Sequence, residues 1–82
     1  MHALIRFDTT DADAFLDAYA SASERRDQAG LTQLQLWREQ GTSAVWGLYD
    51  VADREKVAEW LSSETGLRNT LSGTEAHYLG TV

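Results

Sequence analysis

The spacing of apolar residues predicts a strand and then a helix in the first third of the chain. Residues 2–7 alternate with a period of two, which is typical of a strand. Apolar residues then recur at spacings of three and four to about Asp27, which predicts an amphipathic helix. Thr10, with Asp13 three residues later, is the predicted N-terminal cap, and Gly30 is the predicted stop. The stripe expected to face the core contains Ala12, Phe15, Leu16, Ala18, Tyr19 and Ala22.

The middle of the chain carries two further strand patterns joined by a polar turn. Residues 31–38 alternate, so that Leu34 and Leu36 are opposed to the row Gln33, Gln35 and Trp37. Residues 39–42 contain a glycine and are typical of a hairpin connection. Residues 44–51 are the most apolar stretch of the chain. A strand that is apolar on both faces is usually covered on both sides, so we expect this one to be central.

The last third of the chain predicts a second helix and a final strand. Asp53 is the predicted helix cap, and the buried face is expected to carry Val57, Trp60 and Leu61. Residues 62–73 are rich in Ser, Thr and Gly and are expected to form a mobile covering loop, with a short helical turn near residues 67–71. The last strand is expected over residues 75–80.

This order of elements, strand–helix–strand–strand–helix–strand, predicts an α+β fold with one antiparallel sheet and both helices on one face. The right-handed rule for crossovers places the third strand between the first and the second, which gives the spatial order 4-1-3-2. The uncovered face is expected to carry Trp37 or Trp46 beside Gln33 and Gln35. Because monomers rarely expose so large an apolar face, we expect two copies to pair through it as a homodimer.

Composition agrees with one small domain over residues 1–82 and disfavours several functions. The chain has no cysteine and only two histidines, so we expect neither disulfides nor a metal site, and association is the remaining way to stabilise a thin core. A net charge of −6 disfavours binding to nucleic acid and to anionic membranes. No apolar run is long enough for a signal peptide or a membrane span, and we expect a cytoplasmic protein.

Five stretches of the chain have patterns of buried and helix-capping positions that can be compared with those of known families. They are residues 3–7, 22–30, 48–57, 64–68 and 75–79. In these stretches the chain resembles an uncharacterised branch of the dimeric α/β-barrel proteins, the antibiotic-biosynthesis-monooxygenase-like superfamily. The resemblance covers nearly the whole chain. It implies a ferredoxin-like βαββαβ fold that pairs into a barrel, with a cavity in each subunit or at the dimer seam. It specifies fold better than chemistry.

Members of this superfamily include cofactor-free monooxygenases of aromatic polyketides, haem-degrading enzymes and isomerases. The haem-degrading branch relies on an asparagine on a strand, together with a tryptophan and a histidine. Asn69 is the only asparagine in this chain, and it falls in the predicted loop. The resemblance therefore does not extend to haem chemistry, and no cofactor is expected.

His77 and Arg6 are the candidate catalytic residues, and each has a structural alternative. His77 lies on the last predicted strand, beside the strand that carries His2, and histidine acts as an acid or base near neutral pH. The alternative, stronger for His2 at the terminus, is a half-buried histidine with one hydrogen bond. Arg6 can hold an anionic or enolate-like ligand through its planar guanidinium. Its alternative is an ion pair with a neighbouring acid or a position at the rim.

The candidate substrate-binding residues are Gln33, Gln35, Trp37 and Trp46. An aromatic ring beside two amides is able to orient a flat ligand. The alternative for the glutamines and Trp37 is a row exposed on an edge strand or hydrogen-bonded across a dimer seam. The alternative for Trp46 is core packing, since its strand is central.

Two functions stay open on the sequence. The leading one is a cofactor-independent enzyme, of monooxygenase or isomerase type, that acts on a small aromatic or carbonyl-containing molecule in a barrel cavity. The other is a non-catalytic dimeric module that binds a metabolite or a protein partner. No nucleophile motif and no phosphate-binding glycine loop occurs. A cavity with an inward histidine or arginine would favour the enzyme, and a solidly packed interior would favour the module.

Overall fold

A computed structural model describes residues 1–63 and 65–82 of the chain. Glu64, part of the predicted covering loop and of one resembling stretch, lies outside the described residues. The elements of the described residues, in chain order, are β1 (His2–Thr9), α1 (Ala12–Ser21), α2 (Ser23–Gln28), β2 (Leu31–Arg38), β3 (Ala44–Val51), α3 (Arg54–Ser63), α4 (Thr65–Arg68) and β4 (Leu71–Leu79).

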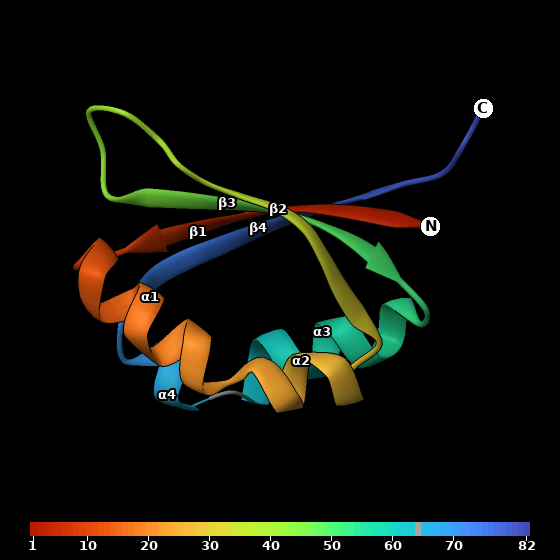
Figure 1. The fold of residues 1–82 in the computed structure, drawn as a ribbon, viewed down its shortest axis with the longest axis horizontal. Helices are drawn as coiled ribbons and strands as arrows, with labels where there is room; N and C mark the ends of the chain where they lie inside the picture. The colour runs from red at the N-terminus through yellow and green to blue at the C-terminus, as the bar shows by residue number, and fades with distance from the viewer. Residues whose placement is uncertain (64) are drawn as a thin grey trace.

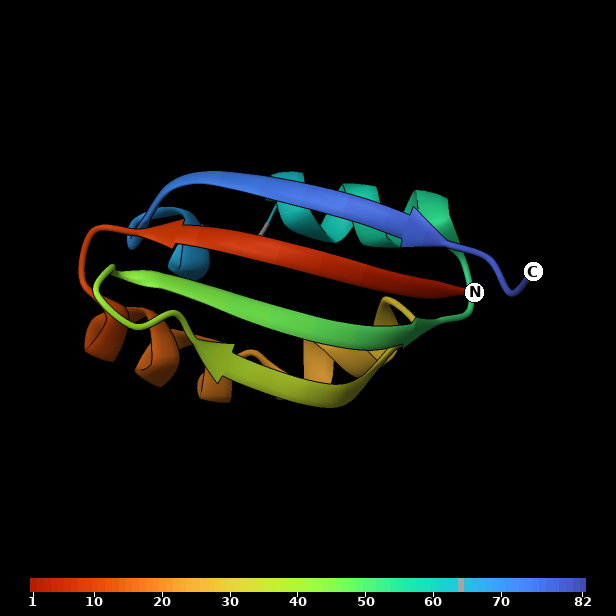
Figure 2. The same cartoon turned by 90° about the horizontal axis from the view of Figure 1, so that it is seen from above.

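The strands form one sheet in the order β2-β3-β1-β4, in which every neighbouring pair is antiparallel. This confirms the predicted order 4-1-3-2 and the ferredoxin-like arrangement. The helices of the described residues all lie on one side of the sheet and leave its other face uncovered (Figure 1). Viewed from that uncovered side, β1 and β3 run through the middle of the sheet, with β4 and β2 at its edges (Figure 2).

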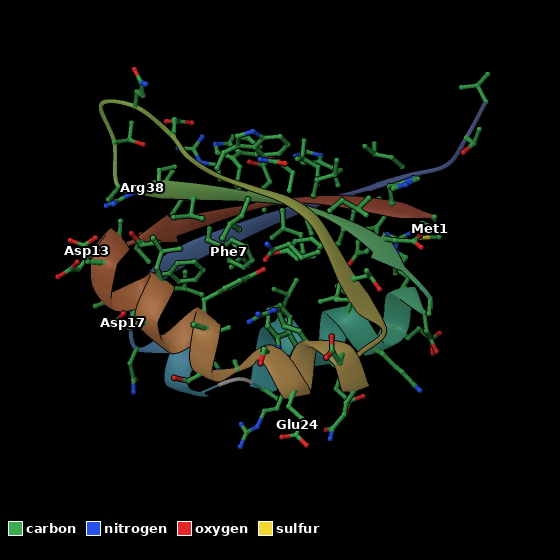
Figure 3. The ribbon with its side chains drawn as sticks, in the orientation of Figure 1. Met1, Phe7, Asp13, Asp17, Glu24 and Arg38 are labelled. Carbon is green, nitrogen blue, oxygen red and sulfur yellow. The ribbon has the colours of Figure 1, made fainter. Side chains whose placement is uncertain are left out.

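The hydrophobic core fills the space between the sheet and the helices. Every second residue of β1 is buried there, and Phe7 points from the sheet towards the helices (Figure 3). The ring of Phe7 lies 4.9 Å from that of Phe15, which in turn lies 5.6 Å from that of Tyr19. The residues predicted from the helical stripes are confirmed on this side: Phe15, Tyr19, Val57 and Trp60 are buried, and Leu61 packs against them.

The first helical segment begins and divides differently from the prediction. Asp11, not Thr10, is the N-cap, because its side-chain oxygen accepts hydrogen bonds from the backbone N–H groups of Asp13 (3.0 Å) and Ala14 (3.2 Å). The Thr10 hydroxyl instead donates to the carbonyl of Thr70 at 3.3 Å. The segment is also two helices rather than one, since Ala22 leaves helical geometry at φ −96° and ψ 13°. Gly30 ends α2 at φ +76°, as its position predicts.

The segment predicted as a covering loop is largely helix and strand. α3 continues to Ser63, α4 follows, and β4 begins at Leu71 rather than at residue 75. Leu67 is only 3% exposed and belongs to the core, which anchors this segment to the rest of the molecule. The sequence does not predict the start of β4 correctly, because the small and polar residues at positions 72–74 show no alternation of apolar and polar side chains. The predicted cap Asp53 is confirmed, since its side chain accepts the N–H of Glu55 at 2.9 Å.

Candidate functional site

The face of the sheet that the helices leave uncovered, called the open face below, carries most of the predicted site residues. Arg6 pairs with Trp46 on one side and with Glu75 on the other, and Trp46 pairs with Trp37. Residues paired across an antiparallel sheet point to the same face. One row therefore crosses the sheet as Trp37, Trp46, Arg6 and Glu75, and we call it the aromatic row. The next row contains Gln35, Leu48, Leu4 and His77.

Arg6 is held in place by a carboxylate and an aromatic ring. Its Nε donates to Asp8 Oδ1 at 2.8 Å, and its guanidinium carbon lies 5.6 Å from the centroid of the Trp46 ring. The hydrogen bond and the charge of Asp8 raise the pKa of Arg6 above its ordinary value. The guanidinium is thus a fixed cation beside an aromatic surface. Arg6 forms the ion pair expected under the structural alternative, and its place on the open face also allows it to contact a ligand.

Trp46 is fixed from above by the hairpin between β2 and β3, which rises over the open face (Figure 1). Its indole Nε1 donates to Glu39 Oε1 at 2.9 Å, and Thr42 donates its hydroxyl to the other carboxylate oxygen at 2.9 Å. These two hydrogen bonds, led by that from Trp46, lower the pKa of Glu39. Trp37 beside it is 45% exposed, so the row presents one restrained and one accessible indole.

His77 also stands on the open face, next to the aromatic row. Its Nε2 lies 3.1 Å from Glu75 Oε1, and its side chain is 49% exposed. Glu75 is the cross-strand partner of Arg6, so the predicted pair His77 and Arg6 both border the same carboxylate residue. Sequence reasoning missed Asp8 and Glu75, although each stands two residues from its partner on a strand and so shares its face.

Gln33 corrects the predicted row, because it does not share a face with Gln35 and Trp37. The register of β2 shifts between Gln33 and Gln35, where the extra residue Leu34 is 49% exposed. A bulge of one residue reverses the alternation on the far side of it. Gln33 therefore pairs with Tyr49 and turns to the helix side, whereas Gln35 and Trp37 stay on the open face.

Gln33 ends a buried chain of hydrogen bonds on the helix side. The hydroxyl of Tyr19 donates to Gln33 Oε1 at 2.6 Å and lies 2.8 Å from the hydroxyl of Tyr49. Burial raises the pKa of both phenols. The guanidinium of Arg26 lies 3.6 Å over the Tyr19 ring and donates to the carbonyl of the same residue.

Two grooves on the helix side of the molecule lie away from the predicted site. One opens between α2 and α3, and another lies beside α3, α4 and the start of β4. Neither is lined by His77, Arg6 or the tryptophans of the open face. Within the described part of the chain, no group of three acidic or histidine side chains is placed to hold a metal ion. No helix in residues 1–63 or 65–82 has the length and apolar character needed to cross a membrane.

Comparison with known proteins supports the fold and leaves the chemistry open. No protein-family model and no curated protein matches the sequence. A solved NIPSNAP domain protein from Burkholderia xenovorans, described as uncharacterised, is similar in structure, with a TM-score of 0.65 at 15% identity over 100% of this chain and 95% of that one. A protein from Agrobacterium tumefaciens is similar with a TM-score of 0.70 at 13% identity, over 100% of this chain and 94% of that one. At these identities the likeness shows the fold alone.

Proposed function

We propose that this protein is a non-catalytic homodimeric module in which two open faces pair, and that the aromatic row at the seam binds a small aromatic molecule. The observation that carries the proposal is the restrained cation and indole of Arg6 and Trp46 beside the accessible indole of Trp37. The buried hydrophobic cluster between sheet and helices supports a module rather than an enzyme with its site in the interior. The resemblance to the antibiotic-biosynthesis-monooxygenase-like superfamily supports the pairing of two sheets.

Energetics favour the pairing. Exposed apolar side chains on or beside the sheet include Leu34, Trp37 and Leu79. An interface of about 1,600 Å², at about 25 cal/mol per Å² of its apolar share, contributes on the order of 20 kcal/mol before association costs. Those costs are about 4–15 kcal/mol. The remainder is comparable with the whole stability of a small domain, so folding and dimerisation should be coupled.

The dimer is tested by light scattering and by thermal unfolding at several protein concentrations. We expect a mass of twice 9.1 kDa and a midpoint that rises with concentration. Trp37→Glu should yield the monomer, because it places like charges in the seam. Ala20→Glu adds the same charge on exposed helix surface and should leave the dimer intact. A wild-type mass of one chain at micromolar concentration, with a constant midpoint, would refute the pairing.

Binding is tested with a neutral aromatic ketone, 1-tetralone, followed through the indole N–H signals of the three tryptophans by NMR. We expect saturable shifts at Trp37 and Trp46 and weaker binding in Arg6→Gln, which removes the cation but keeps polarity. Equal affinity in Arg6→Gln, or shifts confined to Trp60, would contradict the proposed site.

A second candidate, the cofactor-independent enzyme, is favoured by the contact of 3.1 Å between His77 Nε2 and Glu75 Oε1. A carboxylate that contacts one imidazole nitrogen can orient the ring, so that the other nitrogen acts as a general base next to a substrate carbonyl. The test is exchange of the α-hydrogens of 1-tetralone for deuterium in heavy water. Catalysed exchange that is lost in His77→Gln and kept in His2→Gln would support the enzyme. Exchange at the buffer rate in the wild type would exclude this reaction.

A further inference from the structure

α2 and α3 lie on the opposite side of the sheet from the open face (Figure 1). Residues of these two helices line a groove. Its volume is about 350 Å³, within the range of small-molecule sites. Long polar side chains and one aromatic ring form its lining. These residues include Arg25, Gln28, Ala29, Lys56, Glu59 and Trp60.

Trp60 supplies a hydrogen-bond donor that the described residues leave unused. The side chain lines the groove, yet the residue is only 5% exposed. Its Nε1 is buried and finds no acceptor in the part of the chain that the structure describes. A buried N–H without an acceptor costs about 1–3 kcal/mol, so nearly all such groups in folded proteins are paired. An oxygen atom brought by a ligand would remove this cost.

The charge of the lining decides which oxygen is favoured. Lys56 projects from the same helix as Trp60, is exposed, and forms no ion pair with the residues that the structure describes. Among the described residues of the lining, Glu59 is the only acid. The whole chain carries a net charge of −6, so the Lys56 ammonium is a local positive charge on an acidic protein.

We propose that this groove binds a small organic acid, a carboxylate on a flat apolar body. One carboxylate oxygen accepts the indole N–H of Trp60 and the other pairs with the ammonium of Lys56, while the apolar body packs on Ala29 and the indole ring. Because Nε1 is buried, the side chains that cover it move aside as the ligand enters. The site lies outside the proposed dimer seam, so the test of this proposal does not depend on the result for the proposed function.

The test uses benzoate as the probe and the indole N–H signals of the protein as the readout. Trp60→Phe assigns the signal, since it removes the N–H and keeps an aromatic ring. We expect a saturable shift of the Trp60 signal with benzoate at millimolar concentrations, and little shift with benzamide, which has the same shape without the charge. Lys56→Gln should weaken benzoate binding by about tenfold or more, as loss of a charge-assisted bond implies.

Arg54→Gln is the matched control, because it removes the same charge from the same helix at a residue outside the groove lining. It should leave benzoate affinity unchanged. Thermal unfolding of Lys56→Gln checks that the variant is folded, and this exposed position should tolerate the change. The proposal is overturned if benzoate leaves the Trp60 signal in place, if benzamide binds as well, or if Lys56→Gln and Arg54→Gln have equal effects.

Discussion

At the scale of single residues, Tyr49 organises the centre of the molecule. Its side chain is fully buried, and its hydroxyl lies 2.8 Å from that of Tyr19. The ring extends over Gly47, two residues earlier on the same face of β3, where an added Cβ would lie 2.2 Å from the Tyr49 hydroxyl oxygen. The missing side chain at position 47 is therefore the space that the phenol occupies.

Gly47→Ala should destabilise the protein by about 1–3 kcal/mol, the usual cost of overpacking a filled core. The new methyl group would overlap the Tyr49 phenol, so the ring would have to move away from the Tyr19 hydroxyl. The measurement is the midpoint of urea unfolding. Gly80→Ala is the control, since a Cβ there meets nothing within 4 Å. Equal midpoints for the two variants would mean that the ring can move at little cost.

The same phenols make stability depend on alkaline pH. Burial raises the pKa of Tyr19 and Tyr49 in the folded protein, whereas unfolded tyrosine titrates at about 10. A group with a raised folded pKa contributes stability that is complete below the unfolded value and is lost as the pH rises above it. The free energy of unfolding should therefore fall above about pH 10, and less steeply in Tyr49→Phe. Parallel pH curves for wild type and variant would show that Tyr49 is not responsible.

Sequence reasoning located single residues well where periodicity is regular. The stripe positions Phe15 and Tyr19 were correct because helical spacing fixes which side faces the core. The predicted face of Gln33 was wrong because a single extra residue, Leu34, reverses the alternation of β2. Nothing in the residue types around Leu34 indicates a bulge. Glu39 was missed since its contact with Trp46 depends on how the hairpin folds back over the sheet, which no spacing rule predicts.

At the scale of elements, the path of the chain after β1 is controlled by the cap of α1 and the break at Ala22. Breaking the helix leaves the carbonyl of Tyr19 available to the side chain of Arg26, which joins α1 and α2. An ion pair between Arg38 and Asp13, with Nη2 and Oδ1 3.2 Å apart, joins the end of β2 to the start of α1 (Figure 3). Because both ends of that pair are largely exposed, it adds little stability.

Asp11→Ala should lower the free energy of unfolding by about 1 kcal/mol, the typical loss for a helix cap. Thr10→Ala should cost less, since the Thr10 hydroxyl makes only one long hydrogen bond, 3.3 Å from its acceptor. Chemical denaturation of both variants measures the difference. A larger loss for Thr10→Ala would restore the cap position that the sequence alone suggested.

At the scale of the whole molecule, strand order was predictable and strand length was not. Right-handed crossovers leave few arrangements for this order of elements, and the apolar run of β3 placed that strand in the interior of the sheet. The start of β4 was missed because residues such as Gly73 and Thr74 show no apolar alternation, although Thr74 pairs with Phe7 in the sheet. The faces of Trp37 and Trp46 followed only from the register.

The bulge at Leu34 also bears on solubility. β2 is an edge strand, and a flat edge with free backbone groups is a template for uncontrolled strand addition. Gln33 and Gln35 pair with the adjacent residues Tyr49 and Leu48, so deleting Leu34 would join them into regular alternation without reversing a face. The shortened chain should fold, yet form fibrils that bind thioflavin at concentrations where the wild type stays clear. If the shortened chain remains clear as well, the bulge has no protective role against strand addition.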